Sequence, residues 1–138
     1  DQSIQKQLDN LDAIHHFAHS RSKIDSSMVS QIELDKFPPV IHPMVKINPV
    51  NNKKAVYFGS HTKSIKNLDG DESSKLLKYL NDFINNEDYI YSHKWDDFDL
   101  IIWDNRSMLH RGQPYDITEP RYLVRATVSD TMSTGTYL

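Results

Sequence analysis

The sequence predicts a mainly β fold with flanking helices, and three observations support this prediction. From Val40 onward, short stretches rich in β-branched and aromatic residues alternate with turn-forming residues, which is typical of strands. One amphipathic segment, between positions 71 and 84, interrupts them with apolar residues at helical spacing. The length of 138 residues and the 38% hydrophobic content fit one domain, or one large piece of a domain, that can bury a core.

The first part of the chain differs in texture from the rest. Residues 4–18 predict a helix that packs on a body lying elsewhere, because their apolar residues recur at helical spacing. That stripe consists of Ile4, Leu8, Leu11, Ile14 and Ala18. Residues 20–36 are polar, lack periodicity and run into two prolines, which are unsuited to a helix interior or a central strand. They predict a long loop that either covers a site or is disordered.

The β-rich part begins with a predicted hairpin, in which residues 45–47 alternate, residues 49–53 turn and residues 55–58 are strand-forming. A helix follows, which Asp71 is expected to cap. Its apolar face consists of Leu76, Leu77, Leu80, Phe83 and Ile84. The acidic residues beside Gly70 lack the spacing of a calcium-binding EF-hand, so capping is the favoured interpretation. Three further strands are predicted, over residues 89–95, 100–104 and 121–129.

The composition argues against several classes of function. A net charge of -3 and the absence of a run of basic residues give no footprint for nucleic acid. No stretch approaches the ~20 apolar residues of a membrane span, and the charged start is not the pattern expected of a signal peptide. Without cysteine the chain holds no disulfide and no thiolate metal site, which suits a reducing compartment, so a cytoplasmic location is expected.

The most informative pattern is the run from Trp103 to His110, followed by Arg121 and Arg125. It combines one imidazole with two anion-binding guanidiniums, the groups of half a non-haem iron site. Strand periodicity puts both arginines on one face, about 13 Å apart, where they serve two anions or two ends of one site. On an ordinary sequence such a face is more often solvated. None of the seven histidines has an acidic residue two places on, so the His-x-Asp pair of a two-histidine, one-carboxylate iron site is missing from the sequence.

These residues resemble the C-terminal half of the taurine dioxygenase and 2,4-dichlorophenoxyacetate dioxygenase family. The matching stretches are residues 71–77, 95–100 and 103–106 with His110, Arg121 and Arg125, preceded by residues 42–45 and the turn at 49–54. The resemblance implies a partial double-stranded β-helix, a clavaminate synthase-like jelly roll. Residues 1–138 would form the C-terminal portion of a single Fe(II)/2-oxoglutarate oxygenase domain. Family members are about twice as long, so the N-terminal half, with its His-x-Asp pair, is expected to be absent.

The resemblance also implies a role for each matching residue. His110 would be the second histidine ligand of Fe(II), since a neutral imidazole suits this metal. Arg121 would clamp the distal carboxylate of the co-substrate 2-oxoglutarate, and Arg125 would meet an anionic group of the substrate. His61, after the hairpin, has a weaker claim to substrate contact. The implied reaction uses O2 to hydroxylate a small anionic organic substrate and releases succinate and CO2; no side chain is assigned as a catalyst.

Other residues have simpler interpretations. Asp104, Asn105 and Arg106 predict a structural turn and ion pair, and Trp95 and Trp103 predict core or pocket wall. His15 and His19 have an i, i+4 spacing that can bind zinc, but the sequence offers no third ligand nearby. The remaining histidines are expected at the surface or at strand ends. Phe98 stands at a turn where many family members have glycine.

Two classes of function remain open. The first is an oxygenase portion that works once an oligomer, a second chain or a longer polypeptide supplies the missing half; the isolated chain would be inactive. The second is a catalytically inactive jelly-roll remnant or anion-binding module that keeps the arginines without iron. A cupin-like binding protein has weaker support, because cupin metal sites also need several histidines.

Overall fold

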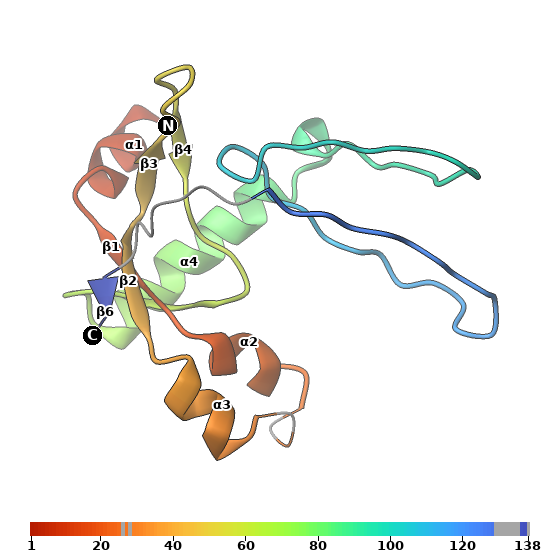
Figure 1. The fold of residues 1–138 in the computed structure, drawn as a ribbon. Helices are drawn as coiled ribbons and strands as arrows, with labels where there is room; N and C mark the ends of the chain where they lie inside the picture. The colour runs from red at the N-terminus through yellow and green to blue at the C-terminus, as the bar shows by residue number, and fades with distance from the viewer. Residues whose placement is uncertain (26, 28, 129–135, 138) are drawn as a thin grey trace.

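A computed structural model describes residues 1–25, 27, 29–128 and 136–137 (Figure 1). The helices are α1 (Gln2–Leu8), α2 (Phe17–Ser22), α3 (Gln31–Lys36) and α4 (Gly70–Ile84), followed by the 3-10 helix η2 (Glu87–Tyr89). The strands are β1 (Asp12–His15), β2 (Val40–Pro43), β3 (Val45–Ile47), β4 (Lys54–Val56), β5 (Thr62–Ile65) and β6 (Thr136–Tyr137). The described residues up to 89 are called the body below, and residues 90–128 are called the outer segment.

The body contributes β5, β1 and β2 to a four-stranded antiparallel sheet in the order β5-β1-β2-β6, and the edge strand β6 follows the outer segment in the sequence. Ala13 of β1 lies opposite His42 of β2 on one side and Ile65 of β5 on the other. Next to this sheet, β3 and β4 form a hairpin with Val45 opposite Val56. The predicted hairpin is therefore confirmed.

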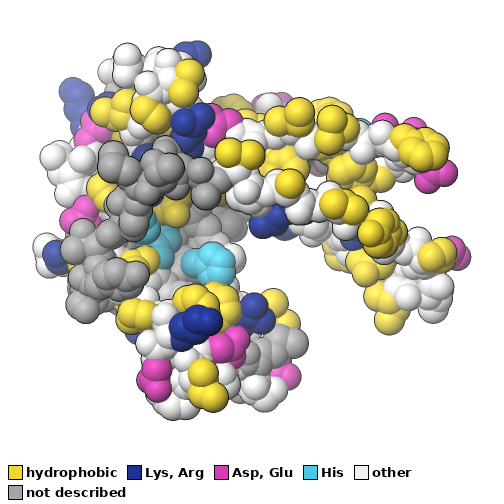
Figure 2. All heavy atoms as spheres, in the orientation of Figure 1, with side chains coloured by type: hydrophobic (Ala, Val, Ile, Leu, Met, Phe, Trp, Pro, Cys, Tyr) yellow, Lys and Arg dark blue, Asp and Glu magenta, His cyan; other side chains and the backbone are white. Residues whose placement is uncertain are grey.

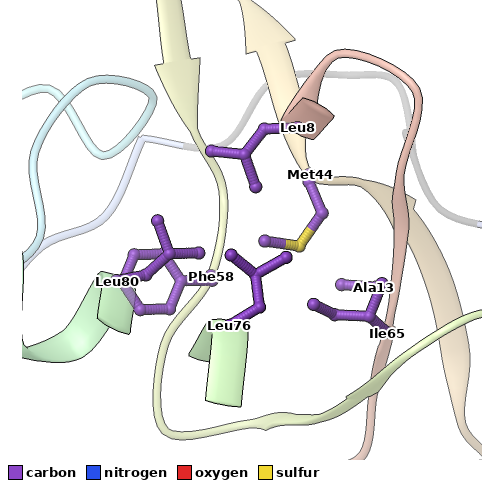
Figure 3. Close-up of a cluster of buried hydrophobic side chains, with 7 residues drawn as sticks. All are labelled: Leu8, Ala13, Met44, Phe58, Ile65, Leu76 and Leu80. Carbon is purple, nitrogen blue, oxygen red and sulfur yellow. The ribbon is translucent and has the colours of Figure 1, made fainter. Parts of the chain in front are cut away.

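The core lies between α4, α1 and the strands, and its side chains point toward one another in Figure 3. It consists of Leu8, Ala13, Met44, Phe58, Ile65, Leu76 and Leu80. A buried hydroxyl joins helix and sheet, because Ser73 Oγ accepts a hydrogen bond of 2.8 Å from the backbone N–H of Ile65. The predicted apolar face of α4 is confirmed for Leu76 and Leu80, which are buried, whereas Phe83 stays half-exposed.

The prediction of one helix over residues 4–18 is wrong beyond Leu8. The helix α1 ends there, and residues 12–15 form β1, the strand that pairs with both β2 and β5. Within β1, Ala13 and His15 are buried whereas Asp12 and Ile14 are half-buried, a period of two instead of 3.6. Pairing on both sides has overridden the helical spacing, although Leu8 does pack on a distant body as expected.

The prediction of a structureless loop over residues 20–36 is also wrong in part. The helix α2 continues to Ser22, and α3 begins after Ser30. Ser30 Oγ accepts from the N–H of Glu33, while Glu33 Oε2 accepts from the N–H of Ser30, which is a capping box. The Ser-x-x-Glu spacing was the signal for α3. The residue that caps α4 is Asp69 and not Asp71, since Asp69 Oδ1 accepts from the N–H of Glu72 at 2.7 Å.

The outer segment contains no strand among its described residues, so the predictions of strands over 89–95, 100–104 and 121–128 are wrong for this chain; Ser129 lies outside the described residues. Figure 1 shows this segment as two long excursions away from the body. Its apolar side chains are largely exposed (Figure 2). They include Phe98, Leu100, Ile102, Ile117, Tyr122, Val124 and Val128. The alternation that predicted strands is present, but the described chain offers no neighbouring strand to pair with.

No helix in the described ranges is long and apolar enough to cross a membrane.

Candidate functional site

A turn at residues 103–108 opens the run that contains the predicted metal ligand, and a buried amide ties it to the body. Asn48, at the end of β3, is only 3% exposed. Its Nδ2 donates to Asp104 Oδ2 at 2.9 Å and to Ser107 Oγ at 3.0 Å, while its Oδ1 accepts from the N–H of Val50. The Asn48 amide therefore fixes the position of the turn at residues 103–108 relative to the body.

The turn also contains an ion pair within the outer segment. Asp104 Oδ1 accepts from both the backbone N–H and Nε of Arg106 at 2.9 Å. The side-chain hydrogen bonds from Arg106, followed by its backbone hydrogen bond, lower the pKa of Asp104 to about 2. Asp104 is therefore a carboxylate at neutral pH, and the prediction of a structural turn with an ion pair is confirmed.

His110 is exposed and lies against Trp103, with the ring centroids 5.0 Å apart. The indole is held in turn, because Trp103 Nε1 donates to Asn105 Oδ1 at 2.7 Å. Trp103 thus packs against His110, the predicted metal ligand, as expected for a residue in a pocket wall. Across the described residues, no group of three or more histidine, cysteine, aspartate or glutamate side chains is placed to hold a metal ion. His110 by itself supplies one ligand.

The two predicted anion-binding arginines also lie in the outer segment. The guanidinium of Arg121 stacks on the ring of Tyr115, with Cζ 4.5 Å from the ring centroid. Arg125 is exposed. No hydrogen bond, ion pair or ring contact identified among the described residues joins His110 to either arginine. A second tie to the body comes from Arg111, whose Nη1 donates to Asn85 Oδ1 at the end of α4.

His61 lies in the body, just before β5, and α2 orients its ring. Its Nδ1 is 2.7 Å from Ser20 Oγ, and its ring stacks on Phe17 at an interplanar angle of 12°. The Ser20 hydroxyl has one proton, which it donates to the Phe17 carbonyl at 3.0 Å. His61 Nδ1 thus lies against the hydroxyl oxygen of Ser20, and the donor and acceptor roles of the two ring nitrogens depend on the tautomer of the ring.

A cluster of rings beside the core was missed by the sequence analysis. The ring of His15 lies 5.3 Å from that of His42 and 5.1 Å from that of Tyr57. Lys46 Nζ is 3.2 Å from His42 Nδ1 and 3.6 Å from the centroid of Tyr57. Burial, followed by the positive charges of His42, Lys46 and His61, lowers the pKa of His15 to about 4. The cluster draws on β1, β2, β3 and the residue after β4, so no local spacing reveals it.

The zinc interpretation of His15 and His19 is not supported, because the two residues do not share a helix. His15 ends β1 with its ring in the cluster, and His19 lies in α2. Thr62 Oγ1 accepts from the N–H of Gly59 at 3.0 Å and lies 3.4 Å from His15 Nδ1. Among the described residues, His15 Nε2 has no hydrogen-bond partner.

One excursion of the outer segment ends in a turn that carries its own polar contacts. His93 Nε2 lies 2.9 Å from Asp99 Oδ2, and Tyr91 Oη lies 3.1 Å from His93 Nδ1. Asp99 Oδ2 also accepts from the N–H of Asp96, and this bond followed by that of His93 lowers the pKa of Asp99. Phe98 occupies this turn with φ of 70°, the left-handed region that favours glycine.

The taurine catabolism dioxygenase TauD, TfdA family matches residues 1–127, a range that includes the body, His110 and both arginines. The chain belongs to this family. The resemblance inferred from residues 42–54 and 71–125 is thereby confirmed.

Two curated members of the family illustrate the match. The chain is 34% identical over 127 residues to the alpha-ketoglutarate-dependent 2,4-dichlorophenoxyacetate dioxygenase of Cupriavidus pinatubonensis, covering 92% of the chain and 44% of that protein. It is 31% identical over 144 residues to the (S)-phenoxypropionate/alpha-ketoglutarate-dioxygenase of Sphingobium herbicidovorans, covering 100% of the chain and 50% of that protein. The chain thus spans about half the length of the curated relatives it matches.

A solved structure extends the family likeness to the backbone. The crystal structure of AAD-2 in complex with Mn(II) and N-oxalylglycine superposes with a TM-score of 0.90 at 33% identity, covering 97% of this chain and 53% of that one. Coverage this high includes most of the outer segment. Its extended path is therefore shared with that solved structure, and the coarse prediction of a sheet-rich fold with flanking helices is confirmed.

Proposed function

We propose that the chain is the C-terminal portion of an Fe(II)- and 2-oxoglutarate-dependent dioxygenase that hydroxylates a small anionic organic substrate and releases succinate and CO2. The observation that carries the proposal is the superposition on the AAD-2 complex, which follows the chain through the outer segment. That segment holds His110, Arg121 and Arg125 within the family match. The names of the two curated relatives, both alpha-ketoglutarate-dependent dioxygenases, support the reaction class.

In this proposal each side chain binds or orients, and none reacts. His110 offers one imidazole to the metal, with its ring orientation limited by Trp103. Arg121 offers a planar fork of donors to a carboxylate of 2-oxoglutarate, and Arg125 offers the same fork to an anionic group of the substrate. His61 offers its ring nitrogen Nε2 to a polar group of the substrate. These four assignments stay predictions.

The residues of this chain do not by themselves fit an Fe(II) site. A site of this type needs two histidines and a carboxylate, and the described residues contain no such group around His110. We therefore propose that the other ligands come from a segment outside residues 1–138, either in a longer polypeptide or in a second chain, including a second copy in a homo-oligomer. When bound, the metal would supply the oxidising chemistry with O2.

The outer segment is the surface that such a segment would cover. It combines exposed apolar side chains with extended backbone that has no ladder partners among the described residues. An exposed, unpaired and apolar extended segment favours pairing with another chain. Both the unpaired backbone and the missing ligands would be satisfied by the same additional strands.

The test compares the chain alone with a fusion to the portion of the Cupriavidus pinatubonensis relative that the chain does not cover. Anaerobic Fe(II) and 2-oxoglutarate are added, and the visible charge-transfer band of the chelated keto acid is recorded. We expect no band for the chain alone and a band for the fusion, lost in His110→Ala, weakened in Arg121→Ala and retained in the matched control His93→Ala. A folded fusion without a band would contradict the oxygenase assignment.

The same experiment separates the alternative, an inactive remnant or anion-binding module. The specific observation in its favour is that the described residues provide a single imidazole beside two arginines. Such a module would bind 2-oxoglutarate without metal, and added Fe(II) would not change the dissociation constant. Binding that requires Fe(II) in the fusion would exclude it.

A further inference from the structure

A pocket lies away from the outer segment, between α2, α3 and β5. Figure 1 shows the two short helices side by side at one end of the sheet. The pocket has a volume of about 360 Å3. It is lined by His16, Ala18, His19, Ser22, Val29, Leu34 and Lys63. This volume lies within the usual range for sites that bind small organic molecules.

The charged side chains that line the pocket are all basic. His16, His19 and Lys63 face it from the start of α2, from within α2 and from β5, and no lining residue is acidic. Burial, followed by the positive charges of Lys23, Lys63, His16 and His61, lowers the pKa of His19. The charges identified as acting on His19 are thus all of one sign, and no carboxylate lines the pocket among the described residues.

The rest of the lining is apolar and comes mainly from the helices. Ala18 is buried, and Val29 and Leu34 are half-buried. The Ser22 hydroxyl already donates to the carbonyl of His19 at 3.2 Å, which leaves its oxygen as the polar group of the wall. A ligand that fills this pocket therefore meets donors on one side and hydrocarbon on the other.

We propose that this pocket binds a small organic anion, a carboxylate carried on a short apolar body, with Lys63 and His19 as the donors to the carboxylate. A metal ion does not suit the lining, because the pocket offers two imidazoles and an ammonium group instead of a set of three ligands. An inorganic anion would satisfy the donors but leave the wall formed by Val29 and Leu34 unused.

The site lies on different elements from His110, Arg121 and Arg125, so it goes beyond the proposed oxygenase reaction. It neighbours His61, whose ring is held by Ser20 and Phe17 of α2. A ligand in the pocket would contact the same helix that orients this ring. Its binding nevertheless needs no metal, so success or failure here is independent of the charge-transfer experiment.

The test is a titration of the metal-free 138-residue chain with acetate, butyrate and hexanoate, followed by NMR of the histidine rings. We expect a saturable shift of the His19 ring signals and an affinity that rises from acetate to butyrate by up to about fourfold per added methylene. The pKa of His19 should rise when butyrate is bound, because a carboxylate favours the imidazolium.

Two variants and two comparison compounds decide the outcome. Lys63→Met should weaken butyrate binding at least fivefold, whereas the control Lys66→Met, an exposed lysine outside the lining, should leave it unchanged. Equal binding by both variants would overturn the proposal. So would equal binding of the uncharged butyramide, or tighter binding of inorganic phosphate than of butyrate. His110→Ala should bind butyrate normally, and loss of binding in that variant would also contradict the proposal.

Discussion

The body and the outer segment have similar apolar sequence patterns but opposite structural outcomes. In the body, β1 is paired on both sides and its neighbours bury a common core with α4. In the outer segment, residues with the same alternation stay exposed, and residues 90–128 form no backbone ladder. The difference shows that a strand depends on neighbouring strands as much as on its own residues. Alternating apolar and polar residues give a segment one apolar face, but they do not provide the second strand that its backbone must pair with.

The first prediction has the largest expected effect, and it tests whether the core of the body stabilises the fold without a contribution from the outer segment. Leu80→Ala should lower the free energy of unfolding by about 2–5 kcal/mol, since it removes a buried side chain and leaves a cavity. Val124→Ala in the outer segment is the matched truncation, and it should change that free energy by less than about 0.5 kcal/mol. Urea denaturation followed by circular dichroism measures both. Comparable losses in the two variants would show that the outer segment shares the core.

The second prediction concerns pH and the ring cluster. The folded pKa of His15, about 4, lies below its ordinary value of 6.5, so the unfolded chain binds the proton more tightly. Stability should be highest above pH 6.5, fall as the pH drops through 6.5, and stop falling from this cause below about 4. The total loss should be about 3–4 kcal/mol, since each unit of difference between the two pKa values corresponds to about 1.4 kcal/mol. Urea midpoints between pH 7 and 4 measure it.

His15→Gln is the variant that isolates this effect. It removes the titrating group while keeping a polar side chain, so the fall in stability between pH 6.5 and 4 should become shallower. His93→Gln, at the turn of the outer segment, should leave the slope as in the unchanged chain. A slope that His15→Gln does not alter would mean that other groups cause the acid sensitivity.

The third prediction concerns the hydrogen bonds by which Asn48 of the body holds the turn of the outer segment. Asn48→Ala removes a buried amide and leaves the partner groups of Asp104 and Ser107 without its hydrogen bonds. The closed conformation of the turn should lose about 1–3 kcal/mol of free energy relative to open conformations. The fluorescence of Trp103 should change as residues 103–110 become more mobile. Asn51→Ala, an exposed neighbour in the β3–β4 turn, is the control. Unchanged fluorescence in Asn48→Ala would show that the turn holds without this amide.

The smallest effect sharpens the comparison within the outer segment. Phe98→Gly should relieve the left-handed backbone at φ 70°, by roughly 1 kcal/mol, and slow hydrogen exchange of the Asp99 amide about fivefold. That amide donates to the Asp96 carbonyl at 3.2 Å, so its exchange reports closure of the turn. Asn67→Gly is the control, because asparagine tolerates its φ of 63°. Faster exchange of the Asp99 amide in Phe98→Gly would show that the backbone at Phe98 is not strained.

Local signals in the sequence predicted some elements well. The helix α4 follows from its apolar spacing, and the β3–β4 hairpin follows from its turn residues, since both depend on neighbours in sequence. The strand β1 did not, because its partners begin at residues 40 and 62. A helical spacing of Leu8, Leu11 and Ile14 was the competing signal, and pairing in three dimensions overrode it.

The family was predictable from the sequence of the candidate site, whereas the geometry of its residues was not. The spacing of His110, Arg121 and Arg125 identified the family, which the match over residues 1–127 bears out. Their roles stay predictions, because they lie where the described chain forms no contact between them. The ring cluster at His15 and the basic pocket at His19 could not be read from spacing, since each combines side chains from several elements.

The position of β1 inside the sheet sets an order of events during synthesis on the ribosome. Thr62, which pairs with His15, lies 47 positions later in the chain. At typical elongation rates of about 5–20 residues per second, β1 waits roughly 2–10 seconds before β5 has been made. During that interval the apolar side chain of Leu8 and the open edge of β1 lack their final cover. Until β5 has been made, one edge of β1 is therefore open to pairing with another strand.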